Sequence, residues 1–233
     1  MSRDRSPGQF DRYKREAALA AVEAEIRDGM IVGLGSGSTA AYAVREIGRR
    51  IREDRWHIQG IPTSERTASL AREAGIPLVA LDAVSEVAVD GADQVAPSLA
   101  LVKGGGGAHA REKIVASASR RTVIVADYSK AVARLTGPVP LEVLPFAMPW
   151  ILRAVPGRLP SAEVRPRLRL GRPVLSDNGN VIAELVCGTI DNPGALAARL
   201  DEIPGIVEHG LFVGIAHVVY FAGPEGIKKL QKV

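Results

Sequence analysis

The segment "MIVGLGSGSTAAYAVREIGRRIRED" at residues 30–54 decides which fold we expect for this chain. Its first six residues are apolar or glycine, which is typical of a short buried strand, and its second half is rich in helix-forming residues. A turn rich in glycine and serine, residues 33–39, joins the two. A buried strand followed by such a turn and a helix is the repeating unit of a parallel α/β sheet, so the segment predicts that fold class.

The segments on either side continue the alternation of helices and strands. Helices are expected at residues 9–28, 64–75 and 108–119. Strands are expected at residues 57–64, 76–81, 86–95, 99–104 and 122–127. Because parallel strands need right-handed crossovers that cover both faces of the sheet, this alternation predicts a Rossmann-like parallel-sheet main domain.

The alternation ends where four prolines occur within residues 135–150. Prolines interrupt regular elements, so we place a boundary there. The segments after it are expected to form a strand, a hairpin whose turn is "DNGN", and a helical region, at residues 165–171, 173–186 and 192–210. This order predicts a small α+β domain at residues 137–209.

The apolar segment 211–223 is expected to be a buried strand that returns to the main sheet. We therefore assign residues 1–136 and 210–233 to the main α/β catalytic domain and residues 137–209 to the small α+β domain. The polar start at residues 1–16 lacks the apolar core of a signal peptide, and no apolar run approaches the length of a membrane span. The expectation is a cytoplasmic protein without membrane contact.

Composition narrows the class of partner. The chain has 233 residues, a hydrophobic content of 46%, a net charge of +4 and an aromatic content of 4%. A chain of this kind buries a full core, while the few aromatic residues disfavour a nucleic-acid surface and the modest positive charge suits a phosphorylated metabolite. The single cysteine, Cys187, excludes an internal disulfide, and because the sequence shows no cluster of metal ligands we expect neither metal nor cofactor.

The turn in the first segment is a candidate phosphate site. Its glycines do not complete the dinucleotide pattern GxGxxG, because Ser38 stands at the last position, and no GK[ST] ending of a nucleotide P-loop is present. What remains is Ser36, Ser38 and Thr39 at the start of a helix, where hydroxyls and backbone N–H groups suit one phosphate. The alternative is a tight turn with Ser38 as a helix N-cap.

A pair of acids, Asp90 and Asp93, follows the apolar part of the strand expected at residues 86–95. Residues three apart in a regular strand point to opposite faces, so the two carboxylates converge only if the chain turns at Gly91. Such a pair at the carboxyl end of a strand would meet a substrate hydroxyl. The alternative is an Asx turn that closes the strand, and the pair taken alone favours that alternative.

A run of four glycines in "KGGGGAHAREKI", residues 103–114, ends at the start of a helix. Glycine loses the most backbone freedom on folding, so the run indicates a need for bare backbone N–H groups. With Lys103 and Glu112 it supplies the parts that move a proton beside a carbonyl, namely a base and donors for the oxyanion. The alternative for Glu112 is an exposed residue between Arg111 and Lys113. A helix N-terminus also lowers the pKa of a carboxylate, an effect that burial by substrate could offset.

Three motifs in this order, "GLGSGSTAA", "DGAD" and "KGGGGAHAREKI", together with "ADYSK", "PLEVLP" and "SDNGNVI", resemble ribose-5-phosphate isomerase of the A type. The resemblance covers almost the whole chain, from the first helix to "GIVEHGLF". It implies a small domain of ferredoxin-like form and a homodimer or homotetramer. It also implies a metal-independent aldose–ketose isomerase that interconverts D-ribose 5-phosphate and D-ribulose 5-phosphate in the non-oxidative branch of the pentose phosphate pathway.

The resemblance implies which residues act. Glu112 falls on the family's acid/base carboxylate, which passes a proton between two carbons through a cis-enediolate, and Asp90, Asp93 and Lys103 complete the catalytic set. The residues expected to bind substrate are Ser36, Gly37, Ser38, Thr39, Asp90, Gly91, Ala92, Asp93, Lys103, Gly104, Gly105, Gly106 and Lys130. No metal-binding residue is implied.

Two residues depart from the family's pattern, and two other classes of protein compete. Gln94 stands where an acid is usual, and His109 stands where an apolar residue is usual; for His109, packing or exposure is favoured over a role in the site. The competitors are a phosphosugar sensor that serves a DNA-binding partner, and another enzyme such as an amino-sugar phosphate deaminase or a coenzyme A transferase. A sensor would not need Glu112 and both aspartates, and we expect no helix-turn-helix segment before the domain. The other enzymes should differ in the glycine and acid motifs.

Overall fold

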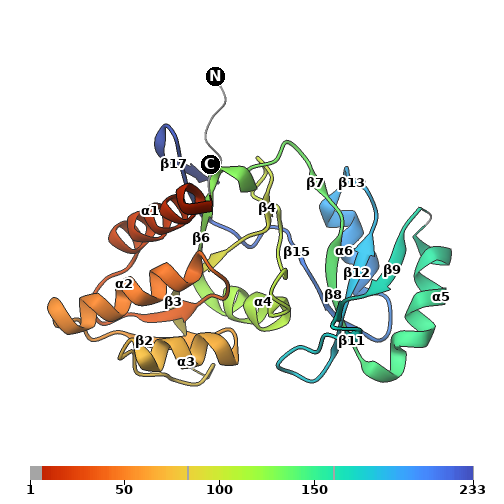
Figure 1. Cartoon of the computed structure of the whole chain (residues 1–233), viewed down its shortest axis with the longest axis horizontal. Coiled ribbons are helices and arrows are strands. Elements are labelled where there is room, and N and C mark those ends of the chain that lie inside the picture. Colours follow the sequence, from red (N-terminus) through yellow and green to blue (C-terminus); the bar gives the residue numbers. More distant parts are fainter. Residues whose placement is uncertain (1–6, 83, 160, 233) are drawn as a thin grey trace.

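A computed structural model describes residues 7–82, 84–159 and 161–232 of the chain (Figure 1). The first part of the polar start, residues 1–6, and residue 233 lie outside the described residues. A six-stranded sheet and a four-stranded sheet stand side by side, with short strands between them. Within the described residues, no helix is both long enough and apolar enough to cross a membrane.

The six-stranded sheet contains the parallel strands. Its order is β17-β16-β6-β3-β1-β2, and every neighbouring pair is parallel except β16 with β17. The strands are β1 (Ile31–Leu34), β2 (Gln59–Pro62), β3 (Ser85–Gly91), β6 (Ser119–Asp127), β16 (Val218–Gly223) and β17 (Gly226–Gln231). The expected α/β class is confirmed, and so is the return of the last apolar segment to this sheet through β16.

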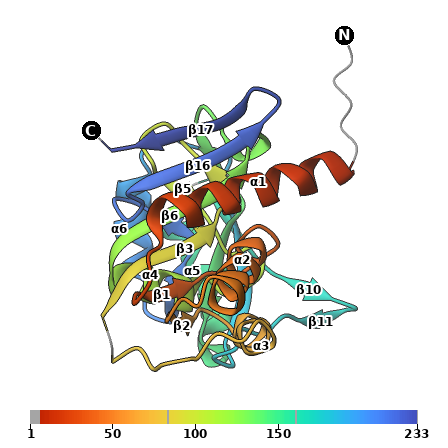
Figure 2. The ribbon, with the colours of Figure 1, turned by 90° about the vertical axis from the view of Figure 1, so that its left-hand side faces the viewer.

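Helices cover both faces of the six-stranded sheet. The helices are α1 (Pro7–Glu25), α2 (Ala40–Glu53), α3 (Glu65–Glu73) and α4 (His109–Ser117). Val87 and Val89 of β3 share a buried core with α1 and α2, whereas Ala88 between them packs with Val115 of α4. This is the alternation expected for a strand buried on both faces. Figure 2 shows α1 lying across the strands of the sheet.

The four-stranded sheet is antiparallel and has the order β14-β8-β12-β9. Its strands are β8 (Val139–Val143), β9 (Glu163–Pro166), β12 (Val181–Val186) and β14 (Ile206–His209), and the helices beside it are α5 (Met148–Arg158) and α6 (Pro193–Asp201). Leu141, Ile151 and Leu200 belong to its buried core. These elements lie inside the range 137–209, and we keep the division into two domains as a proposal.

Short strands lie between the two sheets. Three of them, β4 (Gln94–Val95), β5 (Leu101–Val102) and β15 (Leu211–Phe212), form a small sheet, and β7 (Leu135–Thr136) pairs with β13 (Thr189–Ile190). The remaining elements are β10 (Leu168–Arg169), β11 (Arg172–Pro173) and the 3-10 turns η1 (Tyr128–Lys130) and η2 (Pro145–Ala147). Leu101 and Phe212 pack with Ile124 of β6, so β5 delivers the following residue, Lys103, to the edge of the main sheet.

One expected strand is wrong. Segment 76–81 makes a single bridge, between Leu78 and Gly60 of β2. It lies beside β2 at the end of the sheet, and Pro77 has no N–H group to donate, so a regular ladder does not form.

Three other expected strands are each divided. Segment 86–95 consists of β3 and β4, which are separated at Ala92 and Asp93. Segment 165–171 is shared between β9 and β10, which are separated at Arg167. Segment 211–223 consists of β15 and β16, which are separated by a turn in which Gly214 has a φ of +74°. Apolar residues continue through this last turn, so they do not reveal the break, whereas the first break falls in the polar motif "DGAD".

Several elements lie where the sequence predicts none, among them β8, α5 and β17, and β14 lies in the segment 192–210 that is expected to be helical. Helix α5 contains Pro149 and Pro156. Pro149 lies in the first turn, where the missing N–H group would be unpaired in any case, so the prolines did not exclude a helix. Strand β17 is mostly exposed and carries Lys228 and Lys229, which is typical of an edge strand and lacks the apolar pattern of a buried one.

Candidate active site

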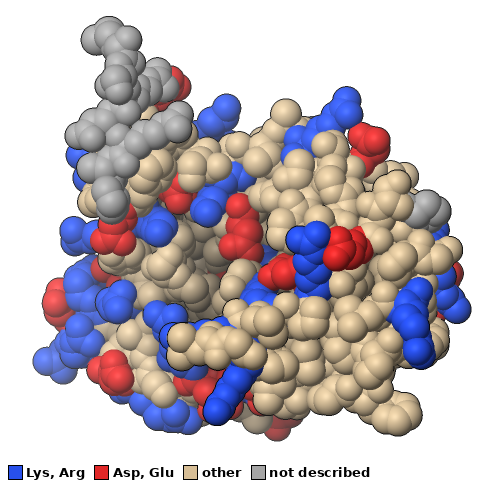
Figure 3. Space-filling model, turned by 45° about the vertical axis from the view of Figure 1, so that its right-hand side comes forward, with Lys and Arg blue, Asp and Glu red and all other residues tan. Residues whose placement is uncertain are grey.

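A pocket of about 130 Å³ opens where the carboxyl ends of β1 and β3 meet the first turns of α2 and α4. It is lined by Lys14, Ser36, Gly37, Ser38, Thr39, Gly91, Ala92, Asp93, Lys103, Gly104, Gly105, Gly106, Glu112 and Lys130. Every predicted substrate-binding residue except Asp90 is in that set. Figure 3 shows this side of the molecule hollowed near its centre, with acidic and basic side chains next to one another around the hollow. A larger cavity of about 390 Å³ lies between η1 and the β16–β17 hairpin and contains none of the predicted site residues.

Three charged side chains meet at the base of the pocket. The Lys103 Nζ lies 3.0 Å from the Asp90 Oδ2 and 3.0 Å from the Glu112 Oε2, and it donates a hydrogen bond of 2.6 Å to the Gly91 carbonyl. None of the three side chains is more than 6% exposed. Two carboxylates thus share one buried ammonium, and the alternative of an exposed Glu112 is wrong.

The imbalance of charge sets the pKa values in this cluster. Burial, followed by the negative charge of Asp90, raises the pKa of Glu112 to about 8 against the opposing charge of Lys103. Burial also raises the pKa of Asp90. Burial opposes the charge on Lys103, but the two carboxylates outweigh it and raise the pKa of the lysine. Glu112 therefore titrates near neutrality, where a general base is most effective, although it lies at a helix N-terminus.

The glycine-rich turn after β1 holds Asp90 in place. The Asp90 Oδ1 accepts a hydrogen bond of 3.0 Å from the Ser36 N–H. A Cβ atom on Gly35 would lie 2.2 Å from that oxygen, so a side chain there would displace the acid. The Ser36 Oγ lies 2.8 Å from the Thr63 Oγ1 and 2.8 Å from the Ser64 Oγ. The N–H group and the hydroxyl of Ser36 therefore already have protein partners, and the N–H group helps to position Asp90.

The chain turns after Gly91, as convergence of the two acids requires. The Asp93 Oδ2 accepts a hydrogen bond of 2.8 Å from the Gly105 N–H, and the charge of Asp93 adds to that of Asp90 in raising the pKa of Glu112. Gly104 has a φ of +102°, and a Cβ atom there would lie 2.7 Å from the His109 Nδ1. A glycine is required at this position both by its conformation and by the close approach of the imidazole.

The next part of the turn, residues 37–39, presents unpaired donors to the pocket. Among the described residues, no protein acceptor is found for the N–H groups of Gly37, Ser38 and Thr39. Thr39 occupies the N-cap position of α2 without a side-chain capping bond, and Ser38 makes none either, so the N-cap alternative is wrong. Lys14 of α1 and Lys130 of η1 line the same pocket. Bare amides at a helix start with two ammonium groups nearby suit a phosphate.

Comparison with known proteins identifies the family. Residues 59–226 match the family model described as ribose 5-phosphate isomerase A (phosphoriboisomerase A). The chain is 48% identical over 221 residues to the ribose-5-phosphate isomerase A of Natronomonas pharaonis, with 94% of this chain and 97% of that protein covered. It is 45% identical over 224 residues to that of Methanothermobacter thermautotrophicus, with 95% and 99% covered. The chain belongs to the ribose-5-phosphate isomerase A family.

Solved structures agree with this assignment. The ribose 5-phosphate isomerase A of Methanocaldococcus jannaschii has a TM-score of 0.90 at 40% sequence identity and covers 95% of this chain and 99% of its own. A D-ribose-5-phosphate isomerase in complex with phospho-erythronic acid has a TM-score of 0.91 at 37% identity, with 96% and 99% covered. The chain is an aldose–ketose isomerase that interconverts D-ribose 5-phosphate and D-ribulose 5-phosphate, a step of the pentose phosphate pathway. The sensor, deaminase and transferase alternatives are not supported.

The two departures of this isomerase from the family's pattern lie outside the pocket. The Gln94 side chain donates to the Thr136 carbonyl at 2.9 Å and accepts from the Thr136 N–H at 2.8 Å, so it ties β4 to β7. A carboxylate could not donate the first of these bonds. His109 is fully buried behind Gly104, and burial lowers its pKa to about 4, so the imidazole is neutral. Of the two interpretations expected for His109, packing and exposure, the structure shows packing.

Sequence reasoning missed several residues of the isomerase's pocket and its surroundings. Lys14 carries no signal, because a lysine on an amphipathic helix is ordinarily exposed. Gly35 was treated as part of a turn, and only the approach of Asp90 reveals why a glycine is needed. Thr63 and Ser64 follow β2, and their hydroxyls reach Ser36 only because β2 pairs with β1.

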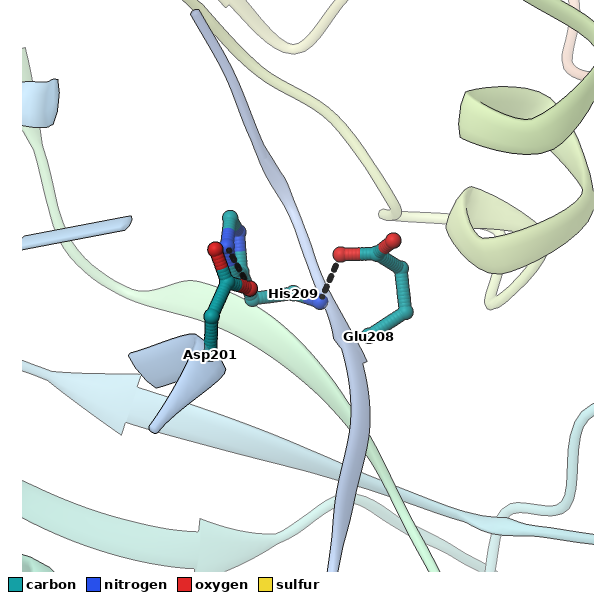
Figure 4. Close-up of side chains that lie close together, drawn as sticks. All are labelled: Asp201, Glu208 and His209. Atoms are coloured by element: carbon teal, nitrogen blue, oxygen red, sulfur yellow. Dashed lines mark hydrogen bonds and ion pairs between the residues drawn. The ribbon is translucent and has the colours of Figure 1, made fainter. Parts of the chain in front are cut away.

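A second cluster of charged groups is formed by Asp201 of α6 with Glu208 and His209 of β14 (Figure 4). The His209 Nε2 lies 3.1 Å from the Asp201 Oδ1, and Glu208 accepts from the His209 N–H at 2.8 Å. These three residues are spaced as metal ligands could be. However, the Lys113 Nζ contacts the Glu208 carboxylate, donates to the His209 carbonyl at 2.8 Å and lies 3.2 Å from the His209 Nδ1. An ammonium group therefore occupies the place of a cation.

Proposed function

We propose that the pocket beside Lys103 is the active site and that Glu112 is its acid/base group. The observation that carries this proposal is one buried carboxylate, with a pKa raised to about 8, in contact with a buried ammonium at the base of a pocket rimmed by unpaired backbone donors. A base that titrates near neutrality can both take and return a carbon-bound proton.

The turn at residues 36–39 binds the phosphate of the substrate. The N–H groups of Gly37, Ser38 and Thr39, at the positive end of α2, donate to the phosphate oxygens, and Lys14 and Lys130 neutralise its charge. A related isomerase was solved in complex with phospho-erythronic acid, which supports a phosphosugar as the ligand. This end of the pocket contributes binding energy and fixes the position of the sugar relative to Glu112.

The sugar ring opens first. Asp90 and Asp93 lie beside Lys103 and Glu112, and we assign them the protons of the ring oxygen and of the hydroxyl groups. Glu112 then removes the proton from C2 of the open aldehyde, and the electrons move onto the carbonyl oxygen to give a cis-enediolate. Glu112 returns the proton to C1, which yields the ketose.

Lys103 and the glycine N–H groups stabilise the enediolate. Prearranged donors at a developing oxyanion are typically worth about 3 kcal/mol each in the transition state. Because the lysine and the amides supply this stabilisation, we propose that the reaction needs neither metal nor cofactor.

The proposal is tested by incubation with ribose 5-phosphate and EDTA in heavy water. We expect ribulose 5-phosphate to form in the presence of the chelator and deuterium to enter the sugar, because the proton on Glu112 exchanges with solvent between the two transfers. Glu112→Gln should lose activity by roughly 1,000-fold and still bind the sugar phosphate. The matched control is Glu73→Gln on α3, an exposed glutamate that should keep full activity. Full activity of Glu112→Gln would exclude Glu112 as the base.

We also propose that the enzyme is a cytoplasmic homo-oligomer, a homodimer or a homotetramer. Four large apolar side chains, Leu144, Phe146, Trp150 and Leu152, are exposed within nine residues around η2 and the start of α5, and Phe146 is 97% exposed. A patch of this kind favours contact with a second copy. Phe146→Glu should shift the mass measured by light scattering towards that of the monomer, and an unchanged oligomer would exclude this surface. Cell fractionation tests the location.

A further inference from the structure

The Arg167 side chain crosses from the four-stranded sheet to the glycine run of the active site. Arg167 follows β9, and its side chain is 19% exposed. Its Nη1 donates to the carbonyls of Gly104 and Gly105, both at 3.0 Å. The predicted site contains no residue of the segment 137–209, so this contact joins a second part of the chain to the site.

The guanidinium group is itself held in place. The Arg167 Nε donates to the Glu184 Oε1 at 2.6 Å, and Nη2 pairs with the same carboxylate at 2.5 Å. The Arg167 backbone donates to the Ile182 carbonyl at 2.9 Å and accepts from the Val174 N–H at 2.9 Å. An arginine held at both its backbone and its guanidinium group loses little further conformational freedom when it binds a second partner.

Holding the two carbonyls fixes the two N–H groups in the same peptide units. In a trans peptide the N–H and C=O bonds point to opposite sides, so donors on the carbonyls of Gly104 and Gly105 turn the N–H groups of Gly105 and Gly106 away from Arg167. The Gly105 N–H reaches the Asp93 Oδ2 at 2.8 Å. Among the described residues, the Gly106 N–H has no protein acceptor, and Gly106 lines the pocket.

Glycine populates both signs of φ with similar ease, so a peptide between two glycines can flip at low cost. The Gly104–Gly105 peptide is also held by Asp93 and by the Gly107 N–H, which donates to the Gly104 carbonyl at 3.0 Å, whereas among the described residues Arg167 is the one donor to the Gly105 carbonyl. We propose that Arg167 is a positioning residue that keeps the Gly105–Gly106 peptide in the orientation needed for the Gly106 N–H to donate to the enediolate oxygen. This inference rests on the function proposed above.

The test compares three variants by steady-state kinetics and ligand binding. Arg167→Met removes the donors and keeps the length of the side chain, and Arg167→Lys keeps the charge but cannot bridge two carbonyls as a rigid fork. The matched control is Arg165→Met on β9, two residues before Arg167, where Arg165 pairs with the exposed Glu163 and, among the described residues, donates no hydrogen bond to the glycines. Melting temperature and circular dichroism establish that each variant is folded. The ligands are phospho-erythronic acid, whose carboxylate resembles the planar enediolate, and inorganic phosphate.

We expect the loss in Arg167→Met to fall on the chemical step. Its kcat should drop roughly 10- to 100-fold, with a change in KM below about threefold, because the phosphate is bound elsewhere in the pocket. The affinity for phospho-erythronic acid should fall in proportion, and that for inorganic phosphate should not change. Arg167→Lys should recover part of kcat, and Arg165→Met should match the wild type.

The inference is overturned if folded Arg167→Met keeps kcat and phospho-erythronic acid affinity within twofold of the wild type. It is also overturned if Arg165→Met shows the same loss, because the effect would then belong to the strand. Glu112→Gln in the same assay distinguishes the failure of the proposed active site from the failure of this inference. An active Glu112→Gln rejects Glu112 as the base, whereas an unaffected Arg167→Met rejects only the positioning role of Arg167.

Discussion

Lys103 and Lys113 lie against the same phenylalanine ring, and their pKa values are shifted in opposite directions. The Lys103 Nζ lies 5.3 Å from the centre of the Phe212 ring, and the Lys113 Nζ lies 5.1 Å from it. Each ammonium contacts a carboxylate, and Glu112 and Lys113 are neighbours on α4. Lys103 and Glu112 line the pocket, whereas none of Lys113, Glu208 and His209 does.

The two ammonium groups differ in the number of carboxylates that they contact: two at Lys103 and one at Lys113, where the charge of Asp201 acts without a direct contact. Asp90 and Glu112 outweigh the effect of burial and raise the pKa of Lys103. At Lys113 burial outweighs the contact with Glu208, and the pKa of this lysine is lowered. The first cluster carries surplus negative charge that keeps a proton on Glu112 near neutrality. In the second cluster Lys113 is held by hydrogen bonds to His209 and Glu208. The first cluster lies at a pocket and can act as an acid/base site, whereas the second ties α4 to β14.

The largest effect is expected on activity, from a substitution that breaks the cluster around Lys103. Lys103→Met removes the ammonium that stabilises the enediolate, and we expect kcat/KM to fall roughly 100- to 1,000-fold. Unfolding in urea should show a smaller penalty than a lost buried charge normally causes, because Asp90 and Glu112 take up protons. Activity within tenfold of the wild type would contradict the assignment of Lys103.

The motifs around Lys103 could be predicted to form a site because each is a local sequence pattern that indicates particular chemical groups. Four glycines before a helix, an acid three residues after another acid, and a serine-rich turn after a strand all indicate backbone donors and carboxylates at the ends of strands. The alternation of strands and helices then brings those ends to one edge of a sheet. The predicted class follows from these local rules, whereas the pair Asp90 and Asp93 taken alone favours an Asx turn and needs the neighbouring motifs to indicate a site.

The remaining parts depend on contacts between distant segments, which no local pattern encodes. Arg167 looks like one of several arginines in an exposed strand, and only the packing of the two sheets brings it to Gly104. Lys113 and His209 are far apart in sequence, and nothing at either position indicates their contact. Helix α5 was missed for another reason, since prolines in the first turn of a helix resemble a boundary.

The next expected effect is a shift in the pH dependence of kcat/KM. The carboxylate form of Glu112 is active, so the rate constant should rise with pH through about 8 and then level off. The charge of Asp93 contributes to raising the pKa of Glu112, against Lys103, so Asp93→Asn should move this rise to lower pH, whatever its effect on the maximum. Measurement of kcat/KM from pH 6 to 10 in the wild type and in Asp93→Asn tests this shift. A rise that stays in place or moves upward would exclude electrostatic coupling between Asp93 and the base.

The raised pKa of Glu112 should also make the free energy of unfolding depend on pH. The pKa of Glu112 is raised from an ordinary value of 4.5 to about 8, so the folded state binds the proton more tightly than the unfolded state does. The free energy of unfolding contributed by this group is therefore present below pH 4.5 and is lost as pH rises towards 8. The urea midpoint of the wild type should fall with pH relative to that of Glu112→Gln.

A smaller effect, on stability alone, is expected when the second cluster is broken. Lys113→Met leaves the Glu208 carboxylate and the His209 carbonyl without their donor, and we expect the free energy of unfolding to fall by about 3 kcal/mol. The kcat of the folded variant should stay within twofold of the wild type, in contrast to Lys103→Met. Lys228→Met on the exposed strand β17 is the control and should change stability by less than about 0.5 kcal/mol. A large loss of kcat in Lys113→Met would mean that the two clusters are not independent.

The smallest expected effect is that of a divalent metal on the wild type. Asp201, Glu208 and His209 have the spacing of a metal site, but the His209 Nδ1 accepts the Leu211 N–H at 3.2 Å and the Lys113 ammonium contacts Glu208 and His209. A cation would have to enter against a like charge and displace bonds already made, so excess zinc or manganese should raise the melting temperature by less than about 1 °C. Lys113→Ala removes the competing ammonium and leaves the three ligands, and the same ions should then stabilise that variant measurably. A rise of several degrees in the wild type would show that the lysine does not exclude metal, and the contrast between the two clusters would then need another cause.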